Sequence, residues 1–372
     1  MKILILSNSD VGIYKFRREL LETLTGRHEV FVSVPPGEYG ERIRAAGCTV
    51  IPCELMDRRG VNPIRDLCLF RYYLKQIRSL EPDAVLTYTI KPNVYGGMAA
   101  ACCGVPCLAN ITGLGSAVEN GGLLGLISTS LYRLGLRRAS CVFFQNEENR
   151  ENFLKRRICR GRYRMIPGSG VNLKEFVPEP YPDSADGIRF LFAGRIVPEK
   201  GIREALEAIW RLHGENPSVT MDVVGWSDAC CLPELKQAAA EGAVRYHGPQ
   251  DDMRPFYRAC HCAVLPSYHE GTANVMLEAS ATARPVITTD VPGCRETFEE
   301  GVTGLGCPAR EADALYETMR RFTGLSQDRR ALMGLAARRR MEQRFDRQTV
   351  LNVYLEELDR IEKNLKSDSD KE

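Results

Sequence analysis

The sequence predicts an α/β protein made of two doubly wound domains, each built on a parallel sheet. The chain has 372 residues, enough for two domains of ordinary size. Short apolar runs alternate with helix-like amphipathic runs, which is typical of parallel strands joined by helices. Near the middle of the chain, the polar and proline-rich stretch 177–187 interrupts this alternation. Such a composition indicates a linker between the two domains.

The overall composition narrows the class of protein. Hydrophobic residues make up 44% of the chain and the net charge is +2, which indicates a folded globular protein and gives no support for a nucleic-acid partner. The start of the chain, MKILILSNSD, enters a strand without the features of a signal peptide, so we expect a cytoplasmic location. The 14 cysteines and 5 histidines show no metal-ligand spacing, so we expect no metal and no other cofactor.

One uncharged stretch, 92–118, is long enough to suggest a membrane span. It contains prolines and many glycines, however, and it divides into a helix, a turn and a strand. We therefore assign it to one α/β unit of the first domain.

The first domain should carry seven strands, with ligands at their carboxyl ends. The predicted strands are 2–7, 28–34, 48–53, 83–88, 105–109, 141–144 and 163–166. The first strand leads through Asp10 and Gly12 into a helix that starts at about Tyr14. Gly12 permits a close approach of the backbone to a ligand, and a phosphate can bind at such a turn. Lys15 and Arg17 follow, either as solvated helix charges or as contacts to an anionic substrate.

The fourth and fifth strands also end in polar residues. Lys91 and Asn93 follow the fourth strand, and Asn110, Thr112 and Gly113 follow the fifth. Function collects at the carboxyl ends of parallel strands, so these residues are candidates for a binding site. The glycines that begin with Gly113 indicate a mobile loop over a cleft between the domains.

The second domain opens with a strand that ends in two cations. Strand 189–193 runs into Gly194 and Arg195, and Lys200 follows before the next helix. Paired cations suit a diphosphate, because arginine can fork onto two oxygens while lysine acts as a point charge. The alternative is a salt-bridged loop. Two later strands end at Gly225 and Gly248.

The stretch 265–296 carries the most specific pattern in the chain. Glu270 and Gly271 form a loop, Thr272 is a predicted N-cap, and Glu278 lies on the helix that follows. The first turn of that helix, which includes Ala273 and Asn274, offers N–H groups to a polar or anionic ligand. Glu278 can accept hydrogen bonds from a vicinal diol such as ribose, and Glu270 can hold a second polyol. The alternative is that both carboxylates only stabilise the helix N-terminus, by about 0.5 kcal/mol each.

These motifs resemble those of retaining GT-B-fold glycosyltransferases of family 4. The pattern E-G-x5-L-E-A begins at Glu270, and a Pro-Val strand and a G-x-x-E turn follow it. Gly194, Arg195 and Lys200 match the diphosphate-binding pattern G-R-x4-K-G of this family. Arg284 departs from the family, which often has glycine there. We expect it to lie behind the helix, with little effect.

Segments of the first half are similar to one branch of this family, which extends sugars on polyprenyl diphosphate in capsule, O-antigen and glycan assembly. The matching segments are D-V-G-x3-F-R from Asp10, T-x-K-P-N-x-Y-G around Lys91, and T-G-L-G from Thr112. Many family members have histidine where this chain has Thr112, so the resemblance does not imply a histidine-assisted mechanism at this position.

The resemblance implies two Rossmann-like domains that face a cleft. It divides the chain into an acceptor domain 1–176, a linker 177–187, a nucleotide-sugar domain 188–347, a helix 348–366 that crosses back to the first domain, and a disordered tail 367–372. The implied activity is transfer of a hexose or N-acetylhexosamine from a UDP-sugar to a polyprenyl-diphosphate-linked sugar, with retention and without a metal.

The implied roles divide the candidate residues into two sets. Arg195, Lys200 and Glu270 would take part in catalysis by binding the diphosphate and the donor sugar. The donor set is Gly12, Gly194, Arg195, Lys200, Gly225, Gly248, Glu270, Gly271, Thr272, Ala273, Asn274 and Glu278, with Glu278 on the ribose. The acceptor set is Asp10, Lys15, Arg17, Lys91, Asn93, Asn110, Thr112 and Gly113.

Two helices of the first domain, 62–80 and 123–137, combine apolar or aromatic residues with arginines. Such helices either pack on the sheet with solvated outer faces or lie on an anionic membrane. The resemblance favours peripheral contact with the inner face of the cell membrane.

Two other functions remain open on the sequence alone. A nucleotide-sugar 2-epimerase can share the fold, but it needs a cluster of histidine and carboxylates that the sequence does not offer. A non-catalytic sugar-binding subunit is the second alternative, and the intact charged motifs argue against it.

Overall fold

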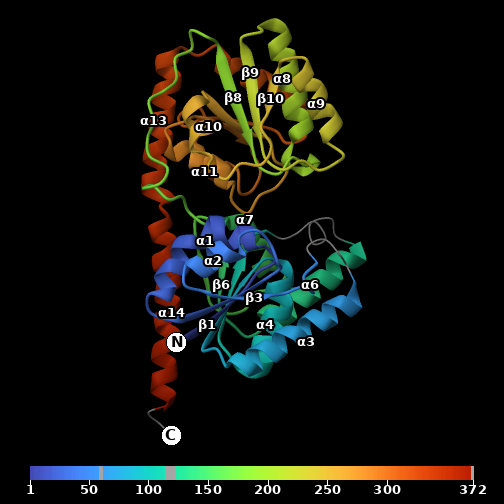
Figure 1. Cartoon of the computed structure of the whole chain (residues 1–372), viewed down its shortest axis with the longest axis vertical. Helices are drawn as coiled ribbons and strands as arrows, with labels where there is room; N and C mark the ends of the chain where they lie inside the picture. Colours follow the sequence, from blue (N-terminus) through green and yellow to red (C-terminus); the bar gives the residue numbers. More distant parts are fainter. Residues whose placement is uncertain (58–61, 114–121, 370–372) are drawn as a thin grey trace. The chain divides into compact units, whose positions relative to one another are not determined.

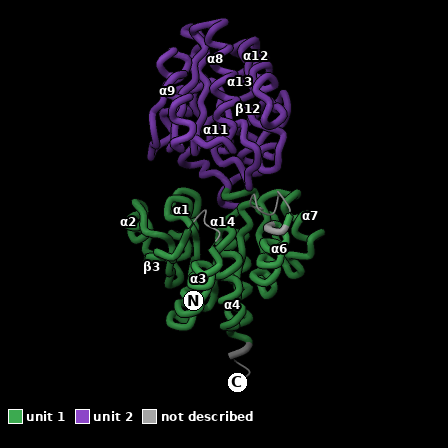
Figure 2. Tube along the Cα trace, turned by 90° about the vertical axis from the view of Figure 1, so that its right-hand side faces the viewer, with its two compact units in different colours: residues 1–169, 350–372 green, residues 170–349 purple. Residues whose placement is uncertain are grey.

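The computed structural model describes residues 1–57, 62–113 and 122–369. It forms two compact units, unit 1 with residues 1–169 and 350–372, and unit 2 with residues 170–349 (Figure 2). The boundary predicted after residue 176 therefore falls inside unit 2. The reason is the packing of Val171, whose side chain lies in the core of unit 2 and whose N–H donates to the Phe345 carbonyl at 2.8 Å.

Unit 1 contains a seven-stranded parallel sheet in the order β3-β2-β1-β4-β5-β6-β7 (Figure 1). The strand order reverses between β1 and β4, so the sheet is doubly wound, as predicted, and ligands bind such sheets at the carboxyl edge. Here the carboxyl edge means the edge where the carboxyl ends of the strands lie. The strands are β1 (Lys2–Leu6), β2 (Glu29–Val34), β3 (Thr49–Pro52), β4 (Ala84–Tyr88), β5 (Cys107–Ile111), β6 (Ala139–Phe144) and β7 (Tyr163–Met165).

Helices cover both faces of this sheet because alternate strand residues point to opposite sides. Leu108 and Phe143 pack with α1 and α14, whereas Ala109 and Phe144 pack with α6 and α7. The helices of unit 1 are α1 (Asp10–Thr25), α2 (Gly40–Ala45), α3 (Pro63–Leu80), the π-helical turn η1 (Pro92–Gly96), α4 (Gly97–Cys103), α6 (Gly122–Leu136), α7 (Glu147–Lys155) and α14 (Arg347–Ser369).

The last helix, α14, completes the core of unit 1. Leu351, Tyr354, Leu358 and Ile361 recur at three- and four-residue spacing and are buried against the first sheet. The helix continues to Ser369, so the start of the tail predicted to be disordered is helical. Residues 370–372 lie outside the described part of the chain.

Unit 2 contains a six-stranded parallel sheet in the order β10-β9-β8-β11-β12-β13 (Figure 1). Its strands are β8 (Ile188–Ala193), β9 (Val219–Val224), β10 (Val244–Tyr246), β11 (Cys262–Leu265), β12 (Val286–Thr289) and β13 (Gly304–Cys307). Its helices and helical turns are η2 (Pro198–Lys200), α8 (Ile202–Glu215), α9 (Leu232–Ala240), α10 (Arg254–Ala259), α11 (Asn274–Ala281), η3 (Arg295–Thr297), α12 (Ala312–Thr323) and α13 (Gln327–Arg344). The two sheets confirm the predicted fold class.

The uncharged stretch forms η1, α4 and β5 up to residue 111, as predicted from its prolines and glycines. Across the described ranges, no helix combines the length and the apolar character needed to cross a membrane. The same ranges contain no group of His, Cys, Asp and Glu side chains arranged to hold a metal ion.

Candidate active site

Three predicted donor glycines lie together at the carboxyl edge of the second sheet. Gly194, Gly225 and Gly248 follow the neighbouring strands β8, β9 and β10. The N–H of Gly225 donates to the Gly248 carbonyl at 2.9 Å. A Cβ on Gly225 would lie 1.7 Å from the Gly194 carbonyl oxygen, and its φ of +144° also requires glycine. These glycines therefore let three strand ends approach each other closely.

The two cations of the second domain differ in environment. Arg195 is exposed and makes no ion pair with any residue that the structure describes. Lys200 is largely buried and forms an ion pair with Glu270, and their side chains are 19% and 13% exposed. The pair joins a residue predicted to bind diphosphate to a residue predicted to bind sugar. It also balances two charges that would be costly to bury alone.

Backbone hydrogen bonds position this ion pair. The Tyr268 N–H donates to the Glu199 carbonyl at 3.0 Å, which ties the Glu270 loop to η2. Gly201, directly after Lys200, has a φ of +71°, and a Cβ there would lie 2.0 Å from the Pro266 carbonyl oxygen. The glycine that ends the G-R-x4-K-G pattern is thus required for close packing of the two loops.

The G-x-x-E turn supports Glu270 from the other side. Gly293 has a φ of +80°, and a Cβ on it would lie 2.3 Å from the Glu270 carbonyl oxygen. Glu296 accepts a hydrogen bond from the Gly293 N–H at 2.7 Å, and the Glu270 N–H donates to the Pro292 carbonyl at 3.2 Å. These contacts explain why glycine and glutamate occur at that spacing.

Helix α11 begins later than predicted. Its N-cap is Ala273 rather than Thr272, because the Thr272 hydroxyl donates to the Gly271 carbonyl instead of accepting from the helix. Asn274 and Glu278 lie one turn apart on α11, as predicted. Glu278 accepts a hydrogen bond from the Tyr257 hydroxyl at 2.7 Å. Burial, and next the Glu278 charge, raise the pKa of Tyr257 well above its usual value, so this hydroxyl remains a donor.

In unit 1, the predicted turn around Gly12 is already helical. Helix α1 starts at Asp10 because the Ser9 side chain caps it, and the Gly12 N–H donates to the Ser9 hydroxyl oxygen at 3.0 Å. The Gly12 N–H is therefore hydrogen-bonded within the chain, at the turn where the sequence predicted that a phosphate can bind. Asp10 accepts a hydrogen bond from the Tyr39 N–H at 3.0 Å, and Lys15 lies over the Tyr39 ring.

Two predicted acceptor residues at the ends of β4 and β5 are fully buried. Asn93 accepts a hydrogen bond from the Thr87 hydroxyl at 2.7 Å and donates to the Asn110 carbonyl at 2.8 Å. Asn110 donates to the Tyr354 hydroxyl and accepts from Gln145 at 2.9 Å. Strand β5 ends at Ile111 rather than at the predicted residue 109, so Asn110 lies inside the strand. Both amides link structural elements of unit 1.

The remaining predicted acceptor residues differ in exposure. Lys91 forms a 2.8 Å ion pair with Asp66 of α3. Thr112 is exposed just after β5, and Gly113 is half-buried. The rest of the loop predicted to be mobile, 114–121, lies outside the described residues. Arg17 is buried, with its guanidinium 5.3 Å from the centroid of the Tyr88 ring.

Several partners carried no signal in the sequence. Tyr257, Asp66 and Tyr354 contact predicted site residues, but each comes from a distant helix and no motif marks it. Only the strand pairing and helix packing bring them close.

Arg284 is far more important to the fold than predicted. It is fully buried, and its guanidinium donates to six backbone carbonyls. Two of these carbonyls belong to Glu179 and Pro180 in the predicted linker, so Arg284 holds this segment against α10 and α11. Burial lowers the pKa of Arg284 below its usual value.

Comparisons with known proteins match both halves of the chain. The model of the family "Glycosyl transferases group 1" matches residues 187–324, and that of the "Glycosyl transferase 4-like domain" matches residues 11–168. A curated relative from Campylobacter jejuni is 29% identical over 98% of this chain and 100% of its own length. Its name is N,N'-diacetylbacillosaminyl-diphospho-undecaprenol alpha-1,3-N-acetylgalactosaminyltransferase.

Solved structures of similar fold cover nearly the whole chain. Anabaena Alr3699/HepE, solved with UDP and glucose, has a TM-score of 0.77 at 19% identity and covers 96% of this chain and 99% of its own. Sucrose-phosphate synthase from Thermosynechococcus elongatus has a TM-score of 0.79 at 20% identity, covering 97% and 98%. The two Rossmann-like units and these structural neighbours show that the protein has the GT-B fold. The family matches and the curated relative then show that this chain is a glycosyltransferase.

Proposed function

We propose that this enzyme moves a hexose or N-acetylhexosamine from a UDP-sugar to a sugar on polyprenyl diphosphate, with retention of configuration. The observation that carries the proposal is the Campylobacter relative, which aligns along its full length and whose name gives an undecaprenol-diphosphate-linked acceptor. The ion pair of Lys200 with Glu270, and the position of Glu278 on α11, support the donor half of the proposal.

In this proposal the donor binds to unit 2. Arg195 and Lys200 hold the diphosphate, Glu278 accepts hydrogen bonds from the ribose, and Glu270 holds hydroxyls of the donor sugar. The open backbone at Gly194 and Gly225 lets the nucleotide approach the strand ends. No metal is required, because the two cations offset the charge of the diphosphate.

The reaction needs stabilisation of the charge that develops on the leaving UDP. Cations fixed before the reaction stabilise that charge without reorganisation, and one such contact typically contributes about 100- to 1000-fold in rate. The acceptor hydroxyl attacks the anomeric carbon from the face that UDP leaves. Its proton passes to the leaving phosphate, so the enzyme needs no separate base and Thr112 can replace histidine. Glu270 steadies the oxocarbenium-like sugar through its hydroxyls.

The test has a binding step and a turnover step. A ligand that binds only the folded protein raises its melting temperature, so purified protein is melted with UDP-, GDP-, ADP- and TDP-sugars. We expect stabilisation by the UDP series alone, lost in Arg195→Ala. The stabilising donor is then incubated with a diphosphate-linked sugar acceptor, and NMR of the product should show the donor's anomeric configuration. Stabilisation by another nucleotide series, or an inverted product, would contradict the proposal.

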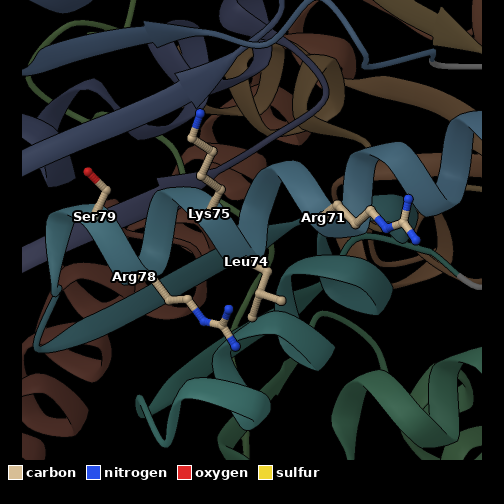
Figure 3. Close-up of a pocket in the computed structure, with 5 residues that line it drawn as sticks. All are labelled: Arg71, Leu74, Lys75, Arg78 and Ser79. Carbon is tan, nitrogen blue, oxygen red and sulfur yellow. The ribbon is translucent and has the colours of Figure 1, made fainter.

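We also propose that unit 1 contacts the membrane that holds the acceptor. Helices α3 and α6 both pack against α4 and carry exposed cations and apolar side chains, here named the basic–apolar surface. Figure 3 shows its cations on α3. The surface comprises Leu67, Arg71, Lys75 and Arg78 of α3 and Leu126 and Ile127 of α6, with Leu126 68% exposed. Cations attract anionic lipids and exposed apolar side chains enter the interface.

Vesicle flotation tests this contact. The protein should float with vesicles that contain anionic phosphatidylglycerol and much less with neutral phosphatidylcholine vesicles. Leu126→Ser with Ile127→Ser should reduce flotation several-fold. Leu332→Ser changes an exposed leucine of unit 2 and should not reduce flotation. Equal flotation of all three proteins would refute the basic–apolar surface as the contact.

A further inference from the structure

Arg17 of α1 is a buried cation with few partners. Its side chain points to the carboxyl end of β4, the residue is only 6% exposed, and its guanidinium lies 5.3 Å from the centroid of the Tyr88 ring. One guanidinium nitrogen donates to the Phe16 carbonyl at 3.0 Å. The Nε makes no hydrogen bond, and within the described ranges no carboxylate forms an ion pair with Arg17.

Tyr88, the last residue of β4, offers a second donor at the same place. It is buried, and its hydroxyl makes no hydrogen bond of normal geometry, although Arg17 and Tyr354 lie close enough to influence its pKa. Burial raises the pKa of Tyr88 well above its usual value, so the hydroxyl keeps its proton. Arg17 and Tyr88 therefore present hydrogen-bond donors at the carboxyl edge of unit 1, and the one carboxylate named at this edge, Asp10, accepts from the Tyr39 N–H instead.

The neighbouring polar groups on this edge are engaged by the protein itself. Asn93 and Asn110 use their amides to link β4, β5 and α14, and Asp10 accepts from a backbone N–H. These residues hold the edge in place. Arg17 differs because a buried guanidinium without a counter-charge is costly, and a bound anion removes that cost.

Two other buried arginines differ from Arg17, one in its hydrogen-bond partners and the other in the edge of the sheet at which it lies. Arg284 is satisfied by six carbonyls, so it needs no anion. Arg330 also has two nitrogens without hydrogen bonds, but it donates to Ser184, which precedes β8 at the amino edge of the second sheet. Ligands of doubly wound sheets bind at the carboxyl edge, where Arg17 lies.

We infer that Arg17, assisted by the Tyr88 hydroxyl, binds an oxyanion of the acceptor, namely its diphosphate. This inference rests on the proposed function for the source of the anion. A guanidinium can fork onto two phosphate oxygens, which suits a diphosphate better than a single point charge does. The acceptor would then be recognised by its charge in unit 1, separately from the donor diphosphate in unit 2.

Calorimetry with inorganic pyrophosphate tests the site without turnover. The measurement uses the full chain with Arg195→Ala and Lys200→Ala, which removes the donor cations. We expect this protein to bind one pyrophosphate, and Arg17→Lys in the same background to weaken binding about tenfold or more. Tyr88→Phe should weaken it less. Arg18→Gln is the matched control, because Arg18 is the next residue, is partly exposed and lies near Glu19 and Glu22; it should bind as the parent does.

Melting curves confirm that each variant is folded before titration. If the background protein binds no pyrophosphate, or if Arg17→Lys binds it as tightly as the parent, the inference is wrong. Arg17→Lys keeps the positive charge, so a folded variant is available even if removing the charge prevents folding.

A kinetic experiment links the site to the acceptor. In the otherwise unchanged enzyme, Arg17→Lys should raise KM for a diphosphate-linked sugar about tenfold and leave KM for the donor unchanged. The same sugar on a neutral aglycone should show no difference between Arg17→Lys and the parent. Equal losses on both acceptors would overturn the assignment to the diphosphate. Absence of any transfer to diphosphate-linked sugars would instead contradict the proposed function, while the pyrophosphate titration still decides whether the anion site exists.

Discussion

The carboxyl edges of the two sheets use polar residues in opposite ways. In unit 2 the predicted residues are charged side chains and glycines. The fold brings them close together and leaves the charged groups partly exposed. In unit 1 two predicted residues, Asn93 and Asn110, are fully buried and hydrogen-bonded within the protein. The difference shows that a polar residue at a strand end indicates a ligand site only when the fold leaves its donors and acceptors available.

The physical reason is the cost of an unsatisfied buried group. An amide buried at a strand end must find partners inside the protein, because an unpaired donor or acceptor costs about 1 to 3 kcal/mol. The charged residues of unit 2 keep part of their surface exposed, so a ligand can replace or join their protein partners. Mutations of the partly exposed charged residues of unit 2 should therefore affect turnover, and mutations of the buried amides of unit 1 should affect stability.

The largest effect should come from Lys200→Ala. We expect kcat/KM to fall about 100- to 1000-fold, because a fixed cation near the leaving diphosphate is lost. Glu270→Ala should reduce turnover similarly, since the sugar and Lys200 both lose a partner. The control is Lys236→Ala, which changes an exposed lysine of α9 and should leave turnover unchanged. Near-normal turnover in both site variants would remove the contrast between the two edges.

Arg284→Met should cost about 3 kcal/mol of stability, because six carbonyls lose their shared donor. The folded fraction should retain most of its turnover, since Arg284 does not contact the predicted donor groups. Arg245→Met changes an exposed arginine of β10 and should alter stability by less than about 0.5 kcal/mol. Urea unfolding measures both. A loss below about 1 kcal/mol would mean that water satisfies the carbonyls instead.

Much of the fold and of the donor site was predictable from the sequence. Alternating apolar and amphipathic runs predicted the strands of unit 1, and the glycine positions marked backbone approaches that the geometry shows to require glycine, as at Gly201 and Gly293. These features are local, because a φ above zero or a close contact excludes other side chains wherever the rest of the chain lies.

Long-range contacts were not predictable in this way. The burial of Asn110 depends on a two-residue difference in where β5 ends and on Tyr354, which is 244 residues away in the chain. Arg284 was judged unimportant because the sequence does not show which carbonyls surround it. A motif thus predicts what its own residues can do, but their burial depends on distant elements.

Asn93→Ala tests the structural role of the unit 1 amides. It removes the partner of the Thr87 hydroxyl and of the Asn110 carbonyl, so we expect a loss of about 2 kcal/mol in stability. KM for the acceptor should stay within about twofold of the parent value, because the Asn93 amide is hydrogen-bonded to Thr87 and Asn110 within the protein. Asn364→Ala on the exposed side of α14 is the control and should not destabilise the protein. A large rise in acceptor KM with unchanged stability would return Asn93 to the acceptor site.

The smallest effect should be the pH dependence of the contact between α14 and β7. Glu357 of α14 is buried and accepts hydrogen bonds from Arg162 at 2.8 and 2.9 Å. Burial alone would raise the pKa of Glu357, but Arg162 and Arg360 outweigh it and hold this pKa below the usual value. The carboxylate of Glu357 therefore stabilises the fold above the pKa that this group has in the unfolded chain. This stabilisation is lost as the pH falls through the lower pKa of the folded state.

Glu357→Gln should lower the melting temperature at pH 7 and have a smaller effect at pH 3 to 4. The control is Glu356→Gln, at an exposed site, which should have little effect at either pH. A difference between Glu357→Gln and the parent that stays constant with pH would show that α14 is held by its apolar face alone.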